Sequence, residues 1–113
     1  MSYSLLIRPE AELDIQDAYQ FYEERSQGLG SEFVRSIDAC FSSIGRNPMA
    51  YPTVYRNIRR ALIRKFPYGI FYLVEYEKIV VIACFHAKQD PKRWQQRGQY
   101  GLMKSSVYLD IRP

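Results

Sequence analysis

Three side chains of this sequence could act together on a phosphate group: Arg60, Arg64 and His86. Cleaving RNA through its own 2′-hydroxyl needs a base for that proton, an acid for the leaving oxygen and cations for the charge that develops on the phosphate. Arg60 and Arg64 are four residues apart, so on a strand they would share one face and could hold a phosphate. Histidine is the side chain best suited to acid–base work near neutral pH.

His86 also has a structural interpretation, which we favour. It ends an apolar segment just before a loop, and a histidine in that position is more often a hydrogen-bonded structural residue than a catalyst; here it could anchor the turn at Asp90-Pro91. Trp94, a little further on, is better explained as a core residue than as a platform for base stacking. The pattern therefore favours a protein that binds a partner over an enzyme.

The basic residues are concentrated in the second half of the chain. Residues 1–45 carry eight acidic and three basic side chains, whereas residues 46–113 carry thirteen basic and four acidic ones, for a formal net charge of +4. This asymmetry points to an anionic partner, either nucleic acid or an acidic polypeptide; a solvated face is the alternative. The predicted partner-binding residues are Arg56, Arg59, Arg60, Arg64, Lys65, His86, Lys88, Lys92 and Arg93. Alternation along a strand would send at most half of the residues between 59 and 65 to one face.

Length and composition predict a single small domain that stays in the cytoplasm. The 113 residues suffice for one core, no apolar run approaches the ~20 residues that cross a bilayer, and residues 1–8 lack the layout of a signal peptide. Cys40 and Cys84 both lie in apolar surroundings and are predicted to be core residues. With one histidine and no closely spaced cysteine pair, we expect no metal site and no cofactor.

The first half of the chain predicts a strand followed by two helices. Residues 3–7 are β-rich, and Pro9 suits the first turn of a helix. An apolar stripe then carries this helix to about Arg25, and residues 27–30 break it. A second stripe begins at Phe33 and ends at Gly45. So short a connection predicts an antiparallel helical hairpin.

The second half predicts three strands after a loop at residues 47–55. These strands are residues 59–66, 69–75 and 79–85, and the last two must form a hairpin because only residues 76–78 separate them. The expected fold is α+β with the order β-α-α-β-β-β, in which the helical hairpin covers one face of a small, mainly antiparallel sheet and a short helix or tail follows. The opposite face, carrying the arginines, would be open to a partner.

An ordered set of short motifs resembles the RelE/ParE superfamily of toxins from bacterial type II toxin–antitoxin systems. The long helical hairpin and the segment Pro67–Tyr72 are most similar to the ParE branch. The match spans residues 3–94, and the order of the motifs, more than any one of them, carries it. The motifs are the Ala-x-x-Asp-Ile-x-x-Ala-x-x-x-Tyr pattern of residues 11–22, Gly30-x-x-Phe33, Asn47-Pro48-x-x-Tyr51-Pro52, Arg59-Arg60 before Phe66-Pro67-Tyr68, and His86 ahead of Asp90-Pro91-x-x-Trp94.

The resemblance implies a toxin that a co-expressed antitoxin neutralises by wrapping an extended segment across it, in a hetero-oligomer. Toxins of the ParE branch bind DNA gyrase and trap it on cleaved DNA without chemistry of their own. Toxins of the RelE branch cut mRNA in the ribosome, and their dense set of basic residues with a late Tyr or His is not matched here residue by residue. We therefore expect a gyrase-binding toxin. The alternatives are a ribosome-dependent endoribonuclease that uses Arg60, Arg64 and His86, and a non-toxic binding module of the same fold.

The C-terminal residues 98–113 form an extension beyond the toxin domain, which we assign to residues 1–97. Val107, Leu109 and Ile111 alternate with polar residues, which is typical of an edge strand. Such a strand could pair with the chain's own sheet, build a homodimer or occupy the groove of the antitoxin. A disordered tail is the alternative.

Overall fold

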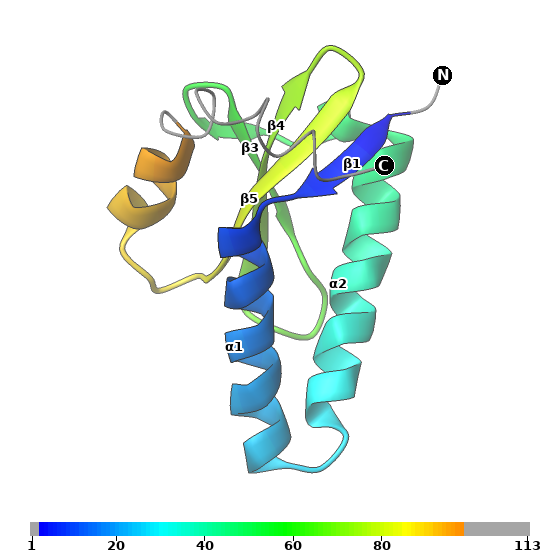
Figure 1. The fold of residues 1–113 in the computed structure, drawn as a ribbon, viewed down its shortest axis with the longest axis vertical. Coiled ribbons are helices and arrows are strands. Elements are labelled where there is room, and N and C mark those ends of the chain that lie inside the picture. Colours follow the sequence, from blue (N-terminus) through cyan, green and yellow to red (C-terminus); the bar gives the residue numbers. More distant parts are fainter. Residues whose placement is uncertain (1–2, 99–113) are drawn as a thin grey trace.

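The computed structural model describes residues 3–98, so the extension predicted for residues 98–113 lies outside the described part except for Gly98. Its elements are β1 (Ser4–Ile7), α1 (Pro9–Arg25), α2 (Leu29–Arg46), the 3-10 turn η1 (Pro48–Ala50), β2 (Thr53–Tyr55), β3 (Ile58–Leu62), β4 (Tyr68–Glu75), β5 (Lys78–His86) and a helix over residues 91–98. Figure 1 shows α1 and α2 side by side, with the helix of residues 91–98 (orange) outside this helical hairpin. The predicted α+β class is confirmed.

The five strands form one sheet in the order β1-β5-β4-β3-β2. β1 pairs with β5 in parallel, and the other three pairings are antiparallel, as a mainly antiparallel sheet requires. The parallel pair is possible because the whole helical hairpin and the three strands that follow separate β1 from β5 in the chain. β1 ends where the Arg8 N–H donates to the Val81 carbonyl, which leaves the edge of β5 beyond Val81 without a strand partner.

α1 begins and ends where its sequence signals predict. Pro9 occupies its first turn together with Glu10 and Glu12, and the Ser26 N–H donates to the Tyr22 carbonyl at its end. The amides at the start of α2 are bound by α1, since the Glu23 carboxylate accepts hydrogen bonds from the N–H groups of Gly28 and Gly30, both at 3.0 Å. The hairpin is therefore closed by a side chain as well as by packing.

The start of the second helix was predicted too late. α2 begins at Leu29, so Leu29 and Gly30 belong to the helix and are not part of the break. Gly28, with φ of 91°, makes the turn, because this left-handed conformation costs glycine little. Gly30 lies against α1, where a Cβ would come within 2.7 Å of the Tyr19 carbonyl oxygen. Glycine normally weakens a helix, but here the close contact between α1 and α2 requires it.

The main core lies between the helical hairpin and the sheet. Buried side chains of α2, among them Phe33, Ile37 and Ile44, pack with buried residues of β4 and β5. Four aromatic rings close one end of this layer, with Phe33 and Phe66 5.2 Å apart in an edge-on arrangement; the other two are Tyr22 and Tyr68. Each such aromatic pair stabilises the fold by more than the burial of its apolar area alone.

The opposite face of the sheet is not open, and the prediction that it would be is wrong. A second cluster covers it, in which Trp94 stacks on Phe71 with ring centroids 4.3 Å apart; the cluster also contains Ile58, Leu73, Val80, Ile82, Ala83 and Phe85. The physical reason is visible in the sequence, because β4 and β5 are apolar on both faces and both must be buried. Trp94 is accordingly a core residue, as predicted.

Two strand assignments also differ from the predictions. β2 (Thr53–Tyr55) lies within the expected loop, where only three residues after Pro52 pair with β3. β3 ends at Leu62 and does not continue to Phe66. The chain turns there because the Ile63 N–H donates to the Tyr68 carbonyl and Lys65 has φ of 72°. None of the described helices is both long enough and apolar enough to cross a membrane.

Candidate binding surface

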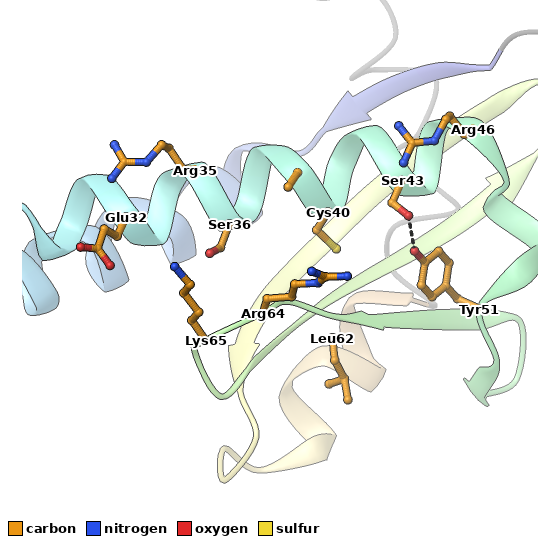
Figure 2. Close-up of a pocket in the computed structure, with 11 residues that line it drawn as sticks. Glu32, Arg35, Ser36, Cys40, Ser43, Arg46, Tyr51, Leu62, Arg64 and Lys65 are labelled. Carbon is orange, nitrogen blue, oxygen red and sulfur yellow. Dashed lines mark hydrogen bonds between the residues drawn. The ribbon is translucent and has the colours of Figure 1, made fainter.

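A groove of about 640 Å³ runs between α2 and the connection from β3 to β4, residues 63–67. We call it the α2 groove. One wall is a face of α2, and the other is built by Leu62, Arg64, Lys65 and Tyr51. Figure 2 shows the Lys65 and Arg64 side chains reaching across toward α2. The residues of the helical wall are Glu32, Arg35, Ser36, Ala39, Cys40, Ser43 and Arg46.

The α2 groove is strongly basic. Four cations line it, Arg35, Arg46, Arg64 and Lys65, against the single carboxylate of Glu32. All four are exposed, and none of their side chains forms an ion pair or hydrogen bond with another residue of the described range 3–98. Arg35 and Arg46 are eleven residues apart, which separates them by roughly 16 Å along the helix. The groove therefore presents positive charge at intervals along its length.

Buried neighbours fix the loop that carries Arg64 and Lys65. Ile63 and Phe66 on either side belong to the main core, so the two basic residues between them are held at the surface. Lys65 adopts a left-handed conformation that disfavours every residue but glycine, at a cost on the order of 1 kcal/mol. Such strain is commonly found at functional positions, where the surrounding structure maintains it.

The polar groups at the floor of the groove do not form a reactive centre. The Ser43 and Tyr51 hydroxyls share a hydrogen bond of 2.6 Å. Burial raises the pKa of the Cys40 thiol to about 11, so it stays protonated near neutral pH and is a poor nucleophile. These groups therefore suit a surface that binds a partner better than a catalytic site.

The comparisons with known proteins identify the family. Residues 5–91 match the family model described as ParE toxin of type II toxin–antitoxin system, parDE. The chain belongs to this family. A solved structure described as the chromosomal ParDE TA system from P. aeruginosa has the same fold, with a TM-score of 0.65 and 16% sequence identity over 74% of this chain and 95% of that one. No curated protein matches the sequence.

In this ParE family member, the predicted basic residues do not form one surface. Of the nine, Arg64 and Lys65 line the α2 groove. Arg59 points to the same side of the sheet but is tied to η1 and its surroundings, where its guanidinium donates to the carbonyls of Tyr51 at 2.5 Å and Met49 at 3.4 Å. Arg56 sits in the β2–β3 turn with φ of 52° and covers the ring of Tyr55 at 5.2 Å.

Arg60 lies on the other side of the sheet. Its side chain packs over Gly69, where an added Cβ would come within 3.1 Å of the Arg60 Cγ. The prediction that Arg60 and Arg64 share a face is therefore wrong, because β3 ends at Leu62 before the alternation reaches Arg64. Arg93 covers Phe85 at 5.1 Å on the helix of residues 91–98, while Lys88 and Lys92 are exposed beside it.

His86 organises the turn that leads into the last described helix. Its Nδ1 accepts a hydrogen bond from the Lys88 N–H at 3.0 Å, and its own N–H donates to Gln89 Oε1 at 2.7 Å. Its ring lies 5.3 Å from that of Tyr68, on the side of the sheet that the helical hairpin covers. His86 and Arg60 thus lie on opposite sides of the sheet.

One polar site was missed entirely by the sequence interpretation. Asp14 of α1 forms an ion pair with Arg97 at 2.6 Å and accepts the Cys84 N–H at 3.0 Å. Arg97 also donates to the Ile82 carbonyl at 3.0 Å, and its own carbonyl accepts from Arg8 at 3.1 Å. These side chains bind the backbone groups on the free edge of β5. No local spacing could have revealed a pair 83 residues apart in sequence.

Proposed function

We propose that this ParE family member is the toxin of a type II toxin–antitoxin module, that it inhibits growth by binding DNA gyrase in the cytoplasm, and that a cognate antitoxin neutralises it. The family match over residues 5–91 is the observation that carries the proposal. The basic α2 groove supports it, because a groove lined by unpaired cations suits an acidic polypeptide.

The geometry favours a mechanism of binding over one of catalysis. RNA cleavage needs a base, an acid and a cation directed at one phosphate. Within residues 3–98, Arg60 lies on the outer side of the sheet, whereas Arg64 faces α2 and His86 lies beside Tyr68. The side chains named for an endoribonuclease do not converge, and nothing in their arrangement supports that alternative over gyrase binding.

Growth of an induced bacterial culture tests the toxin assignment. The chain is expressed alone and together with the product of its neighbouring open reading frame. We expect arrest when the chain is alone and growth when both are present. Undiminished growth in both cultures would overturn the toxin assignment and leave a non-toxic binding module.

Purified components test the target. Gyrase, supercoiled DNA and the chain should accumulate cleaved DNA complexes, and the Arg60→Ala and His86→Ala variants should do so as well. Codon-positioned cuts in mRNA on ribosomes, lost in the same two variants, would instead establish an endoribonuclease. The binding mechanism predicts the first result.

A further inference from the structure

The turn between β4 and β5 holds the most exposed aromatic side chain of the described residues. Tyr76 is 97% exposed, whereas the next most exposed tyrosine in residues 3–98, Tyr19, is 39% exposed. The Tyr76 side chain makes no hydrogen bond or ring contact with another residue in that range. Packing within residues 3–98 therefore does not explain an aromatic ring at this position.

The backbone at Tyr76 is also unfavourable for this type of residue. Glu75 and Lys78 pair across the hairpin, so the loop between them has only two residues. Two-residue hairpin loops usually begin with glycine, asparagine or aspartate, because the favoured turns need a positive φ at that position. Tyr76 has φ of 58°, where a bulky side chain is strained. Strain of this kind is typical of functional positions, where the surrounding structure maintains it.

The turn is anchored at its base. The Ser4 N–H of β1 donates to the Glu77 carbonyl at 3.0 Å, and Val74 at the end of β4 packs against the main core. Pairing with β3 extends along β4 as far as Tyr72, so the end of the hairpin projects beyond β3. In Figure 1 this turn (yellow-green) is at the top, opposite the turn between α1 and α2. An anchored loop loses little conformational entropy on binding, so Tyr76 is presented in a preorganised position.

The charges beside Tyr76 favour a protein as the partner over DNA or an anionic membrane. Glu75 and Glu77 flank the tyrosine directly in the sequence. Two carboxylates repel a phosphate backbone and anionic lipid headgroups. An exposed tyrosine at a protein interface typically fills a pocket of the partner and supplies a large share of the binding energy. The matching surface is an apolar pocket with cations at its rim.

We propose that the β4–β5 turn is a contact surface for the target protein of the toxin, with Tyr76 inserted into an apolar pocket and Glu75 and Glu77 facing cations at its rim. This inference rests on the proposed function, since it assumes that the toxin acts by binding a target. It adds the place of contact and the chemistry of the surface that receives it. The eight residues of β4 separate this turn from the connection that carries Arg64 and Lys65 by roughly 26 Å, so substitutions in the turn do not alter those groove residues.

Binding of the purified full-length chain to immobilised gyrase tests the contact. Tyr76→Asn removes the ring and supplies a residue that adopts a positive φ more readily. We expect the affinity for gyrase to fall by about 10- to 100-fold, while the melting temperature stays the same or rises. Leu13→Ala, which removes another exposed apolar side chain, is the matched control and should bind like the wild type. Unchanged affinity of Tyr76→Asn, or an equal loss in Leu13→Ala, would overturn the proposal.

Two further variants separate the ring from the strained backbone. Tyr76→Phe keeps both the ring and the strain, and should bind gyrase within about 3-fold of the wild type because an apolar pocket needs no hydroxyl. Arg56→Asn relieves a positive φ of 52° in the β2–β3 turn and should leave binding unchanged. If Tyr76→Phe binds as weakly as Tyr76→Asn, the pocket assignment is wrong. If Arg56→Asn is equally weak, the relief of strain and not the loss of the ring is responsible, which also rejects the proposal.

A charge reversal tests the cationic rim. Glu77→Lys and Asp17→Lys change the net charge equally, and both side chains are exposed, but only Glu77 lies in the turn. Glu77→Lys should weaken gyrase binding by about 3- to 30-fold, with a larger loss at low salt, and Asp17→Lys should change it far less. Tighter binding by Glu77→Lys, or wild-type binding to DNA alone that Tyr76→Asn abolishes, would replace the protein pocket with a nucleic acid and overturn the proposal.

Growth assays separate failure of this inference from failure of the proposed function. If the wild type binds gyrase and arrests growth, and folded Tyr76→Asn does both equally well, the turn is not the contact and the toxin assignment stands. If the wild type arrests growth without binding gyrase, and Tyr76→Asn does not arrest growth, the gyrase assignment fails and the turn stands as the contact with another target. A smaller assembly of Tyr76→Asn in sedimentation analysis would make the turn a contact between copies of this chain and reject the proposal.

Discussion

At the scale of single residues, the two glycines within α2 have opposite surroundings. A Cβ at Gly30 would lie 2.7 Å from the Tyr19 carbonyl oxygen and 2.8 Å from two carbons of its ring. At Gly45 nothing lies within 4 Å of the same added atom. The backbone oxygen cannot move without shifting α1, so only the first glycine is required by packing.

Alanine at these two positions should therefore change stability in opposite directions. We expect Gly30→Ala to lower the free energy of unfolding by about 1–3 kcal/mol, since it forces the two helices apart. Gly45→Ala should raise it by about 0.5–1 kcal/mol, because alanine is the better helix former. Urea denaturation measures both. A Gly30→Ala protein as stable as the wild type would show that the helices are not held at this distance.

Asp14 supplies a second residue-scale prediction, on pH. Burial raises the pKa of its carboxyl above the ordinary 3.8, and this outweighs the opposing effect of the Arg97 guanidinium. A raised pKa in the folded state means that folding favours the protonated form, so the contribution of Asp14 to stability is greatest at low pH and falls as the pH rises through the folded-state pKa.

The Asp14→Asn variant isolates this effect because asparagine does not titrate. We expect the free energy of unfolding of the wild type, minus that of the variant, to decrease from acidic to neutral pH. Denaturation curves collected across that range measure the difference. An increase toward neutral pH would mean that the attraction of Arg97 outweighs burial, contrary to this prediction.

At the scale of elements, regular periodicity made the long helices and the central hairpin predictable. The apolar stripe of α1 and the continuous apolar runs of β4 and β5 are local properties of the sequence. β2 was not predictable, because three residues after a proline carry no periodicity and pair only once β3 is beside them. The start of α2 depends on Glu23, a side chain of the preceding helix.

The candidate site was only partly predictable for a similar reason. The basic residues Arg64 and Lys65 could be named from the sequence, but Arg35, which faces them across the groove, lies in residues 1–45, which are acidic overall. What brings them together is the position of α2 against the sheet. The sequence could not show that the Arg59 guanidinium would donate to a backbone carbonyl, or that the Arg60 side chain would pack over Gly69.

The helix of residues 91–98 should be essential to the second hydrophobic cluster, on the face of the sheet away from the helical hairpin. Trp94 is 7% exposed and stacks on Phe71, and Asp90 begins the helix by accepting the Lys92 N–H at 3.0 Å. We expect Trp94→Ala to lower the free energy of unfolding by about 3–5 kcal/mol and to increase binding of the dye ANS, as apolar surface is uncovered. Trp94→Phe, which keeps an aromatic ring on Phe71, is the control and should cost much less. Unchanged stability of Trp94→Ala would show that this helix is not part of the core.

At the scale of the whole molecule, the Asp14–Arg97 pair joins parts of the chain that secondary structure leaves unconnected. β1 protects the edge of β5 only as far as Val81. Beyond it, Arg97 binds the Ile82 carbonyl, Asp14 binds the Cys84 N–H and Gln89 binds the His86 N–H. An unpaired strand edge is a site for unwanted association, and here side chains from α1 and the C-terminal region close it.

Arg97→Ala should therefore expose this edge of β5 and weaken the contact between α1 and the helix of residues 91–98. Arg93→Ala is the matched control, because both arginines lie on the same helix and cover Phe85, at 4.8 and 5.1 Å, but only Arg97 binds Asp14 and the Ile82 carbonyl. We expect Arg97→Ala to lower the free energy of unfolding by about 1–3 kcal/mol, since it leaves part-buried acceptors unsatisfied. Amide hydrogen exchange should accelerate at Cys84 relative to Val80, which lies in the part of β5 that β1 still covers. If exchange at Cys84 is equally fast in both variants, the edge is held by packing on Phe85 and the polar network contributes nothing to its protection.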